Sequence, residues 1–200
     1  MNLLPLSLLG ACLAQDPTPP APETPPPPVV AALTAAPTPG PRALEAGRAL
    51  IGEPYAWGGR NEPSNPGVDC LGLLFLAWGS VSDTPWRSYP VDPSKIVASG
   101  RLGAPVPGLD GVLRADVDLA LLQPGDVLYL LVADYEIPDA PLWRHEGHDY
   151  WPWHTAMYAG EGRALHAQPG GRVRHQDLDG IAWDALYVTR PGEAPTGPVR

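Results

Sequence analysis

Two kinds of hydrophobic pattern divide the chain, helix-like in the first half and strand-like in the second. A first helix is expected to begin near Pro41, because proline is favoured at the first helical position, and to end at Gly52. A second helix is expected over residues 69–78, whose sequence DCLGLLFLAW is apolar on almost every face, so it should be buried. Residues 80–115 are rich in proline, glycine and aspartate, which predicts a long insertion with little regular structure.

Short apolar segments in the second half predict strands. They cover residues 127–133, 154–159, 164–168, 172–175 and 185–189. Glycine-containing turns separate several of these segments, as in antiparallel hairpins. Helices followed by strands predict an α+β fold, in which an antiparallel sheet packs on the buried helix.

The turn at residues 160–162 decides how two histidines are placed. If the turn holds all three residues, Ala156 faces His166, and His154 becomes its diagonal neighbour on the same face. Diagonal neighbours are separated by about 7–8 Å between backbones, a gap that two imidazoles can close. A two-residue turn at 161–162 would instead turn His166 to the other face of the sheet.

The N-terminal segment has the pattern of an export signal. Residues 1–14 carry no charged side chain and form a short apolar region that ends in small residues. The sequence Leu-Gly-Ala-Cys at 9–12 also resembles a bacterial lipobox, in which Cys12 becomes the lipidated first residue and attaches the protein to a membrane. The alternatives are cleavage near Ala14, which discards Cys12, and an N-terminal helix or misassigned start. We therefore expect an exported protein of the periplasm or cell envelope.

A proline-rich segment separates this leader from the folded domain. Of the 28 prolines, eleven lie between residues 16 and 41, where they prevent helices and sheet interiors. We expect residues 15–41 to form a semi-rigid polyproline II tether, with a recognition motif for a proline-binding domain as the alternative. The folded domain is expected at 42–190, followed by a flexible tail at 191–200.

The composition excludes several classes of function. Thirteen basic residues against 22 acidic ones give a net charge of −9, and no arginine-rich stripe is present. Binding to nucleic acid through its phosphates is therefore excluded, and an anionic membrane surface would repel the chain. Two cysteines form neither a disulfide scaffold nor a cysteine-rich zinc site, and we expect no cofactor.

Cys70 is a candidate nucleophile. Lipidation or removal of Cys12 leaves it unpaired, and it lies at the predicted N-terminus of the buried helix, where the helix dipole should lower its pKa. The alternative is a buried cysteine that acts only as a small hydrophobe. A cysteine nucleophile needs a base and a third group that orients this base. His154 and His166 supply both types of group, although a single histidine on a strand is more often structural.

Several motifs occur in an order that resembles the NlpC-type cysteine peptidases of bacterial cell walls. They are GEPYAWGG at 52–59, DCLGLL at 69–74, LQPGDVLYL at 122–130, HTAMYAGEGRALHA at 154–167 and the Gly-Gly-Arg-Val turn at 170–173. Each is weak alone, but together they span residues 52–175. The resemblance implies a papain-like α+β fold and hydrolysis of peptide bonds involving D-amino acids in peptidoglycan stem peptides.

The resemblance also assigns residues. It implies Cys70 as nucleophile, His154 as general base and His166 as the residue that orients it. Tyr55 matches a tyrosine that lines the family's site, with packing of a loop aromatic as the alternative. Asp69 matches an aspartate that helps to bind the free amine of a stem peptide.

Two features depart from the family pattern. Position 71 is leucine, whereas many relatives have a serine that binds the stem-peptide amine together with the aspartate. In addition, 84 positions separate Cys70 from His154, and the excess lies in residues 80–115 and 134–153.

The second of these insertions is rich in aromatic side chains and acids. It contains five aromatic residues: Tyr135, Trp143, Tyr150, Trp151 and Trp153. We expect either a lip over the cleft whose aromatics stack on sugar, or an ordinary packed surface loop. Zinc bound by His145, His148 and an acid is a weaker alternative, because this histidine spacing is not the metalloprotease one. His175 is expected to be a surface strand residue.

These observations predict an exported cysteine peptidase or amidase that acts on peptidoglycan. Leu71 leaves a second hypothesis, another thiol amidase or acyltransferase on the same fold. A third is a non-catalytic envelope protein that binds glycan or a partner through its aromatic insertion.

Overall fold

A computed structural model describes residues 38–135 and 139–192 of the chain. The predicted leader with Cys12, all but the last residues of the tether, and most of the predicted tail lie outside the described residues. In the part that is described, no helix combines the length and the apolar character needed to cross a membrane.

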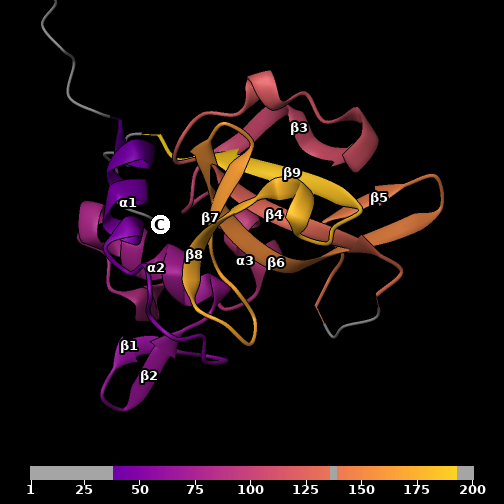
Figure 1. The fold of residues 1–200 in the computed structure, drawn as a ribbon. Helices are drawn as coiled ribbons and strands as arrows, with labels where there is room; N and C mark the ends of the chain where they lie inside the picture. Colours follow the sequence, from indigo (N-terminus) through magenta and orange to yellow (C-terminus); the bar gives the residue numbers. More distant parts are fainter. Residues whose placement is uncertain (1–37, 136–138, 193–200) are drawn as a thin grey trace, which may run out of the picture. The chain divides into compact units, whose positions relative to one another are not determined.

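Three α-helices lie in the first half of the domain (Figure 1). They are α1 (Pro39–Arg48), α2 (Cys70–Ser82) and α3 (Pro93–Ser99), and short 3-10 helices occur at Trp86–Ser88, Arg114–Asp116, Leu119–Leu121 and Leu178–Gly180. Proline stands in the first turn of α1 and α3, as its fixed φ favours. Asp69 caps α2, and its side chain accepts a hydrogen bond from the backbone of Gly72.

Antiparallel strands build the rest of the domain. The main sheet has the order β3-β9-β4-β6-β7-β8, with β5 paired to β6, and β1 and β2 form a separate hairpin. The strands are β1 (Arg60–Glu62), β2 (Asn65–Val68), β3 (Ala104–Leu113), β4 (Val127–Ala133), β5 (Trp143–His145), β6 (His148–Gly160), β7 (Arg163–Ala167), β8 (Val173–Asp177) and β9 (Ala185–Arg190). Helices that precede an antiparallel sheet confirm the predicted α+β class.

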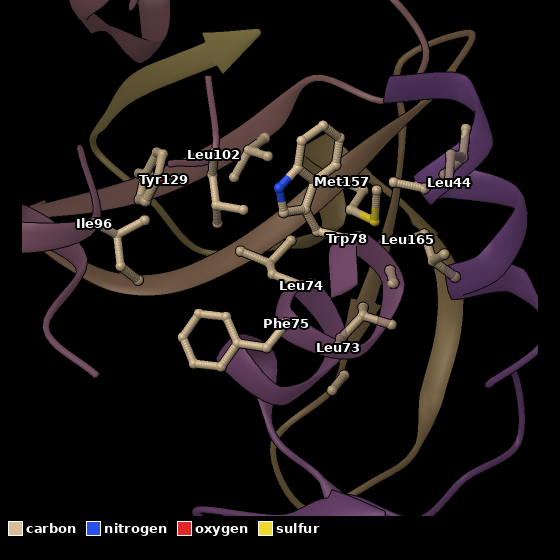
Figure 2. Packing of buried hydrophobic residues seen from close by; sticks show 14 of the residues in the cluster. Leu44, Leu73, Leu74, Phe75, Trp78, Ile96, Leu102, Tyr129, Met157 and Leu165 are labelled. Carbon is tan, nitrogen blue, oxygen red and sulfur yellow. The ribbon is translucent and has the colours of Figure 1, made fainter. Parts of the chain in front are cut away.

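The sheet has an apolar core on each face. On the helix-packed face, shown in Figure 2, side chains of α1 and α2 meet those of the central strands, among them Leu44, Leu73, Trp78, Met157 and Leu165. The core on the opposite face includes Leu109 of the edge strand β3, Leu128, Leu130, Ile181 and Leu186. Alternating residues of β4 therefore enter two different cores, which explains why its sequence is apolar without interruption.

The prediction of little regular structure over residues 80–115 was wrong. This segment contains α3 and the edge strand β3, which pairs with β9. Two prolines and two glycines in the sequence APVPGLDGVL conceal the strand. They are tolerated because β3 lies at the edge of the sheet and its register shifts twice.

The insertion at 134–153 is largely a β-hairpin rather than a loop. β5 pairs with the first residues of β6, and this hairpin extends from one end of the sheet (Figure 1). Because β6 begins at His148, His154 lies in the middle of its strand and does not open it as predicted. The prediction for residues 127–133 coincides with β4.

Candidate active site

The N-terminus of α2 is fixed by the carboxylate of Asp69. Its Oδ1 accepts hydrogen bonds from the backbone N of Gly72 at 2.5 Å and from Nη1 of Arg60 at 2.6 Å. Its Oδ2 accepts a third bond, from the backbone N of Gly58 at 2.9 Å. Asp69 thus joins the 58–60 loop to the helix that begins at Cys70. A substrate amine would have to compete with these three bonds for the carboxylate.

Arg60 is a buried partner that the sequence did not reveal. Only 4% of its surface is exposed, and its guanidinium lies 5.3 Å from the ring centroid of Phe75 and 5.4 Å from that of Trp86. A charge in such a position requires a close counterion, and Asp69 provides it. The pair stabilises the loop that precedes the candidate nucleophile.

Cys70 is the first residue of α2 and is partly exposed. Its thiol lies near Thr155, the residue that follows His154 in β6, whose backbone and hydroxyl favour the thiolate. Burial raises the pKa of Cys70, and the nearby charge of Asp69 raises it further, while the contacts with Thr155 oppose the rise. The expectation that the helix dipole would lower this pKa was wrong, because burial and the capping carboxylate outweigh the dipole.

His154 and His166 are brought together across β6 and β7. Nε2 of His154 lies 2.8 Å from Nδ1 of His166, and both residues are 2% exposed. Met157 pairs with Leu165, and continuing this register places Ala156 opposite His166. The predicted face-sharing of the two histidines is confirmed.

The register arises in a way that the sequence did not predict. The hairpin turn holds only two residues, because Gly160 pairs with Arg163. Such a turn alone would have turned His166 to the other face. A register shift between Tyr158 and Gly160 leaves Ala159 as an extra residue in β6 and restores the pairing.

Both imidazoles are neutral near pH 7. Burial, with a smaller effect of His166, lowers the pKa of His154 to about 3. Burial also lowers the pKa of His166 to about 4, opposed by a hydrogen bond with Gln176 and reinforced by the charge of Arg174. His154 therefore has a free lone pair at neutral pH, and its low pKa makes it a weak base there.

Tyr55 lies near Cys70 and Asp69. It forms a parallel bridge with Val68, one residue before Asp69, and is partly buried. Burial, followed by the negative charges of Cys70 and Asp69, raises the pKa of Tyr55 to about 12. Its phenol therefore stays protonated beside the thiol and is available as a hydrogen-bond donor.

The remaining histidines do not join this site. His145 pairs with His148 in the β5–β6 hairpin, and Nδ1 of His148 lies 2.7 Å from Oδ2 of Asp134. Within residues 38–135 and 139–192, no group of three or more potential metal ligands is found. His175, expected at the surface, is a partly buried residue of β8.

The aromatic side chains of the second insertion mostly pack within the protein. Trp143 stacks on His145 at a centroid distance of 4.8 Å and contacts Tyr150 at the same distance. Tyr150 and Trp151 are buried, and Tyr135 is exposed. The predicted alternative of a packed surface segment therefore describes this insertion better than a lip of free aromatic rings, although the segment is a hairpin and not a loop.

Comparisons with known proteins identify the fold. No family model matches the sequence, and no curated protein is significantly similar. The solved structure of NlpC2 from Trichomonas vaginalis is 21% identical with a TM-score of 0.52, over 79% of this chain and 49% of that one. A structure of the Resuscitation Promoting Factor Interacting protein RipA, mutated at a cysteine, is 20% identical with a TM-score of 0.50, over 78% of this chain and 63% of that one.

A third structure, RipD from Mycobacterium tuberculosis, is a non-catalytic NlpC/p60 domain protein adapted to peptidoglycan binding. It is 16% identical with a TM-score of 0.47, over 78% of this chain and 98% of that one. In contrast, the chain covers less than two thirds of the length of the RipA and NlpC2 structures. At these identities the likeness shows the fold, and the predicted NlpC-type, papain-like α+β fold is confirmed.

Proposed function

We propose that this protein hydrolyses amide bonds in peptidoglycan stem peptides at the cell envelope. Cys70 is the nucleophile, His154 the general base and His166 the residue that orients this base. The observation that carries the proposal is the buried, neutral pair of His154 in β6 and His166 in β7, together with the position of Thr155, the residue after His154, near the thiol of Cys70. The motif resemblance, in register from residue 52 to residue 175, supports the choice of substrate.

The reaction proceeds in two stages. Sγ of Cys70 attacks the amide carbonyl while the thiol proton moves to His154, and His154 then protonates the leaving amine as the C–N bond breaks. Water next attacks the thioester and gives a proton to His154. The C–S bond breaks, the acid is released, and this proton returns to the sulfur of Cys70.

We assign the stabilisation of the developing oxyanion to two groups. The backbone N–H of Cys70 belongs to the first turn of α2, whose N–H groups have no intrahelical partner. The protonated phenol of Tyr55 is the second donor, because its pKa is raised and it lies near the thiol. The charge separation in this site arises during the attack, since both the thiol and the imidazole start neutral.

The carboxylate of Asp69 already accepts three hydrogen bonds, and Leu71 has no polar group to bind a stem-peptide amine. Both features affect which peptide bond is cleaved. We propose that Asp69 acts on substrate indirectly, by fixing the helix that carries Cys70, in place of the direct amine contact that the resemblance implied. Envelope localisation and attachment through a lipidated Cys12 are part of the same proposal. The intact mass of the exported protein tests the lipid, since a diacylglycerol adduct increases it.

Digestion of purified sacculi tests the hydrolase proposal. Wild type should release muropeptides, and Cys70→Ala should release none, with His166→Gln as a second variant that keeps the thiol. Equal release by wild type and Cys70→Ala would overturn the proposal. Adding a primary amine and analysing products by mass spectrometry separates a hydrolase from an acyltransferase, because only a transferase yields the amine adduct as its main product.

One observation favours a non-catalytic alternative. Alternation along β6 places Thr155 on the helix-packed face with Met157, and His154 on the face of Ala156. Within the described residues, no hydrogen bond joins Cys70 to either histidine. If the protein only binds peptidoglycan, wild type and Cys70→Ala should bind sacculi equally well, and neither should release fragments.

A further inference from the structure

A glutamine on the edge strand β8 continues the chain of hydrogen bonds beyond the histidine pair. Oε1 of Gln176 lies 3.3 Å from Nε2 of His166, the ring nitrogen that does not face His154. Nε2 of Gln176 donates to the backbone O of Gly180 at 2.6 Å. The guanidinium of Arg174 donates to the same Oε1.

These neighbours fix the orientation of the amide. A guanidinium has only donors and a backbone carbonyl oxygen only accepts, so the Gln176 oxygen must face Arg174 and the Gln176 nitrogen must face Gly180. The oxygen is thus also the atom that faces His166. Because an amide oxygen only accepts, Nε2 of His166 must carry a proton.

The proton on His166 determines the protons on His154. In a neutral imidazole one nitrogen is protonated and the other has a lone pair, so Nδ1 of His166 accepts. Its partner at 2.8 Å, Nε2 of His154, must then be the donor. Nδ1 of His154 is therefore left without a proton.

We propose that Gln176 is a positioning residue that sets the tautomers of both histidines, so that His154 keeps Nδ1 as its basic nitrogen. This inference deepens the proposed function and rests on it for its kinetic consequence, but the tautomers follow from the contacts and from the neutrality of both rings. Without the Gln176 oxygen, His166 is free to carry its proton on Nδ1 and donate to Nε2 of His154. His154 would then hold its proton on Nδ1 and lose its capacity as a base.

Burial supports the assumption that both rings are neutral. The two histidines are each 2% exposed, and Arg174 lies next to the contact between His166 and Gln176. A charge on His166 would thus be both desolvated and opposed by a neighbouring cation. The single-proton argument therefore applies across the neutral pH range.

Nitrogen NMR of the histidine rings tests the inference without any substrate. Long-range ¹H–¹⁵N spectra of the full chain at pH 7 should show His154 and His166 both protonated at Nε2 in wild type. In Gln176→Leu the Nδ1-protonated form should appear in both rings. Gln176→Glu is the matched control, because a carboxylate still accepts from Nε2 of His166 and should keep the wild-type tautomers. Nδ1 protonation of His154 in wild type, or unchanged tautomers in Gln176→Leu, would overturn the inference.

A kinetic readout connects the tautomers to the reaction. Loss of an orienting group behind a reactive histidine should lower kcat about 10–100-fold in Gln176→Leu, with KM unchanged, and Gln176→Glu should restore most of it. If the NMR spectra show the expected tautomers but wild type and Cys70→Ala digest sacculi equally, the proposed function is overturned and the tautomer inference is not. A shift of tautomers with no loss of kcat would overturn the positioning role alone.

Discussion

His154 and His166 meet edge to face, with ring centroids 5.1 Å apart and ring planes inclined by 84°. This geometry allows one nitrogen–nitrogen hydrogen bond, at 2.8 Å, and prevents stacking. The bond contains a single proton, so the position of the proton on one ring determines its position on the other. Charging either ring in the folded protein requires breaking this arrangement or placing a cation in a buried site.

The first prediction is that this histidine pair makes the free energy of unfolding decrease as the pH is lowered below about 6.5. The pKa values are lowered in the folded state to about 3 and about 4, from an ordinary value near 6.5 that applies to the unfolded chain. Below pH 6.5 the unfolded state therefore binds more protons than the folded state. The stability is fully present above that pH and is lost as pH falls towards 4 and 3. The limiting slope is about 1.4 kcal/mol per pH unit for each histidine.

Urea denaturation between pH 7 and pH 5 measures this slope, in a range where most carboxylates stay charged. His166→Gln removes one of the two groups and should make the slope shallower. A free energy of unfolding that does not change over this range in wild type would contradict the prediction.

The second prediction concerns the reactivity of Cys70. Because burial and Asp69 raise its pKa, alkylation by iodoacetamide should have a midpoint above the value of about 8.5 of a free thiol. Thr155→Val removes the hydroxyl that favours the thiolate and should move this midpoint further up, whereas Thr155→Ser should leave it in place. Labelling is carried out on a Cys12→Ser background, so that only Cys70 reacts.

A midpoint below pH 7 would show a preformed thiolate and contradict this prediction. So would equal midpoints for wild type and Thr155→Val. A slow reaction of Cys70 with iodoacetamide is compatible with the proposed mechanism, because the proton leaves the thiol during the attack on substrate. Thiol reactivity therefore does not distinguish the enzyme from a binding protein, and sacculus digestion does.

The sequence predicted the parts of the site that depend on local pattern. The apolar run after Asp69 indicated a buried, capped helix, and the shared face of His154 and His166 was predicted, although from a three-residue turn where the protein has a two-residue turn and an extra residue in β6. The contacts of Gln176 and Arg60 were beyond prediction, because they depend on how β8 pairs with β7 and how the 58–60 loop meets α2. The strand β3 was missed for a different reason, since its prolines and glycines are tolerated only at the edge position that the fold gives it.

The third prediction concerns the buried pair of Arg60 and Asp69. Asp69→Ala removes the cap of α2 and leaves the guanidinium of Arg60 buried without a counterion, which should cost about 3–5 kcal/mol. Arg60→Met should cost less, because Asp69 keeps its hydrogen bonds from two backbone N–H groups. The exposed pair of Arg144 and Asp149 is the control, and Arg144→Ala should cost about 0–1 kcal/mol.

Chemical denaturation of the three variants at pH 7.5 measures these differences. A cost for Asp69→Ala no larger than that for Arg144→Ala would contradict the structural role of the pair. In that case, a loss of activity in an Asp69 variant would point back to the direct substrate contact that the motif resemblance implied.

The fourth prediction concerns the turn that sets the histidine register. Its two residues both have positive φ, 54° at Glu161 and 70° at Gly162, a conformation that asparagine and glycine adopt more readily than glutamate. Glu161→Asn should therefore increase the free energy of unfolding by about 0.5–1 kcal/mol. Glu161→Gln removes the same charge but keeps the unfavourable conformation, so it should change stability by less than about 0.5 kcal/mol. Equal effects of the two substitutions in urea denaturation would show that charge, and not backbone conformation, controls stability at this position.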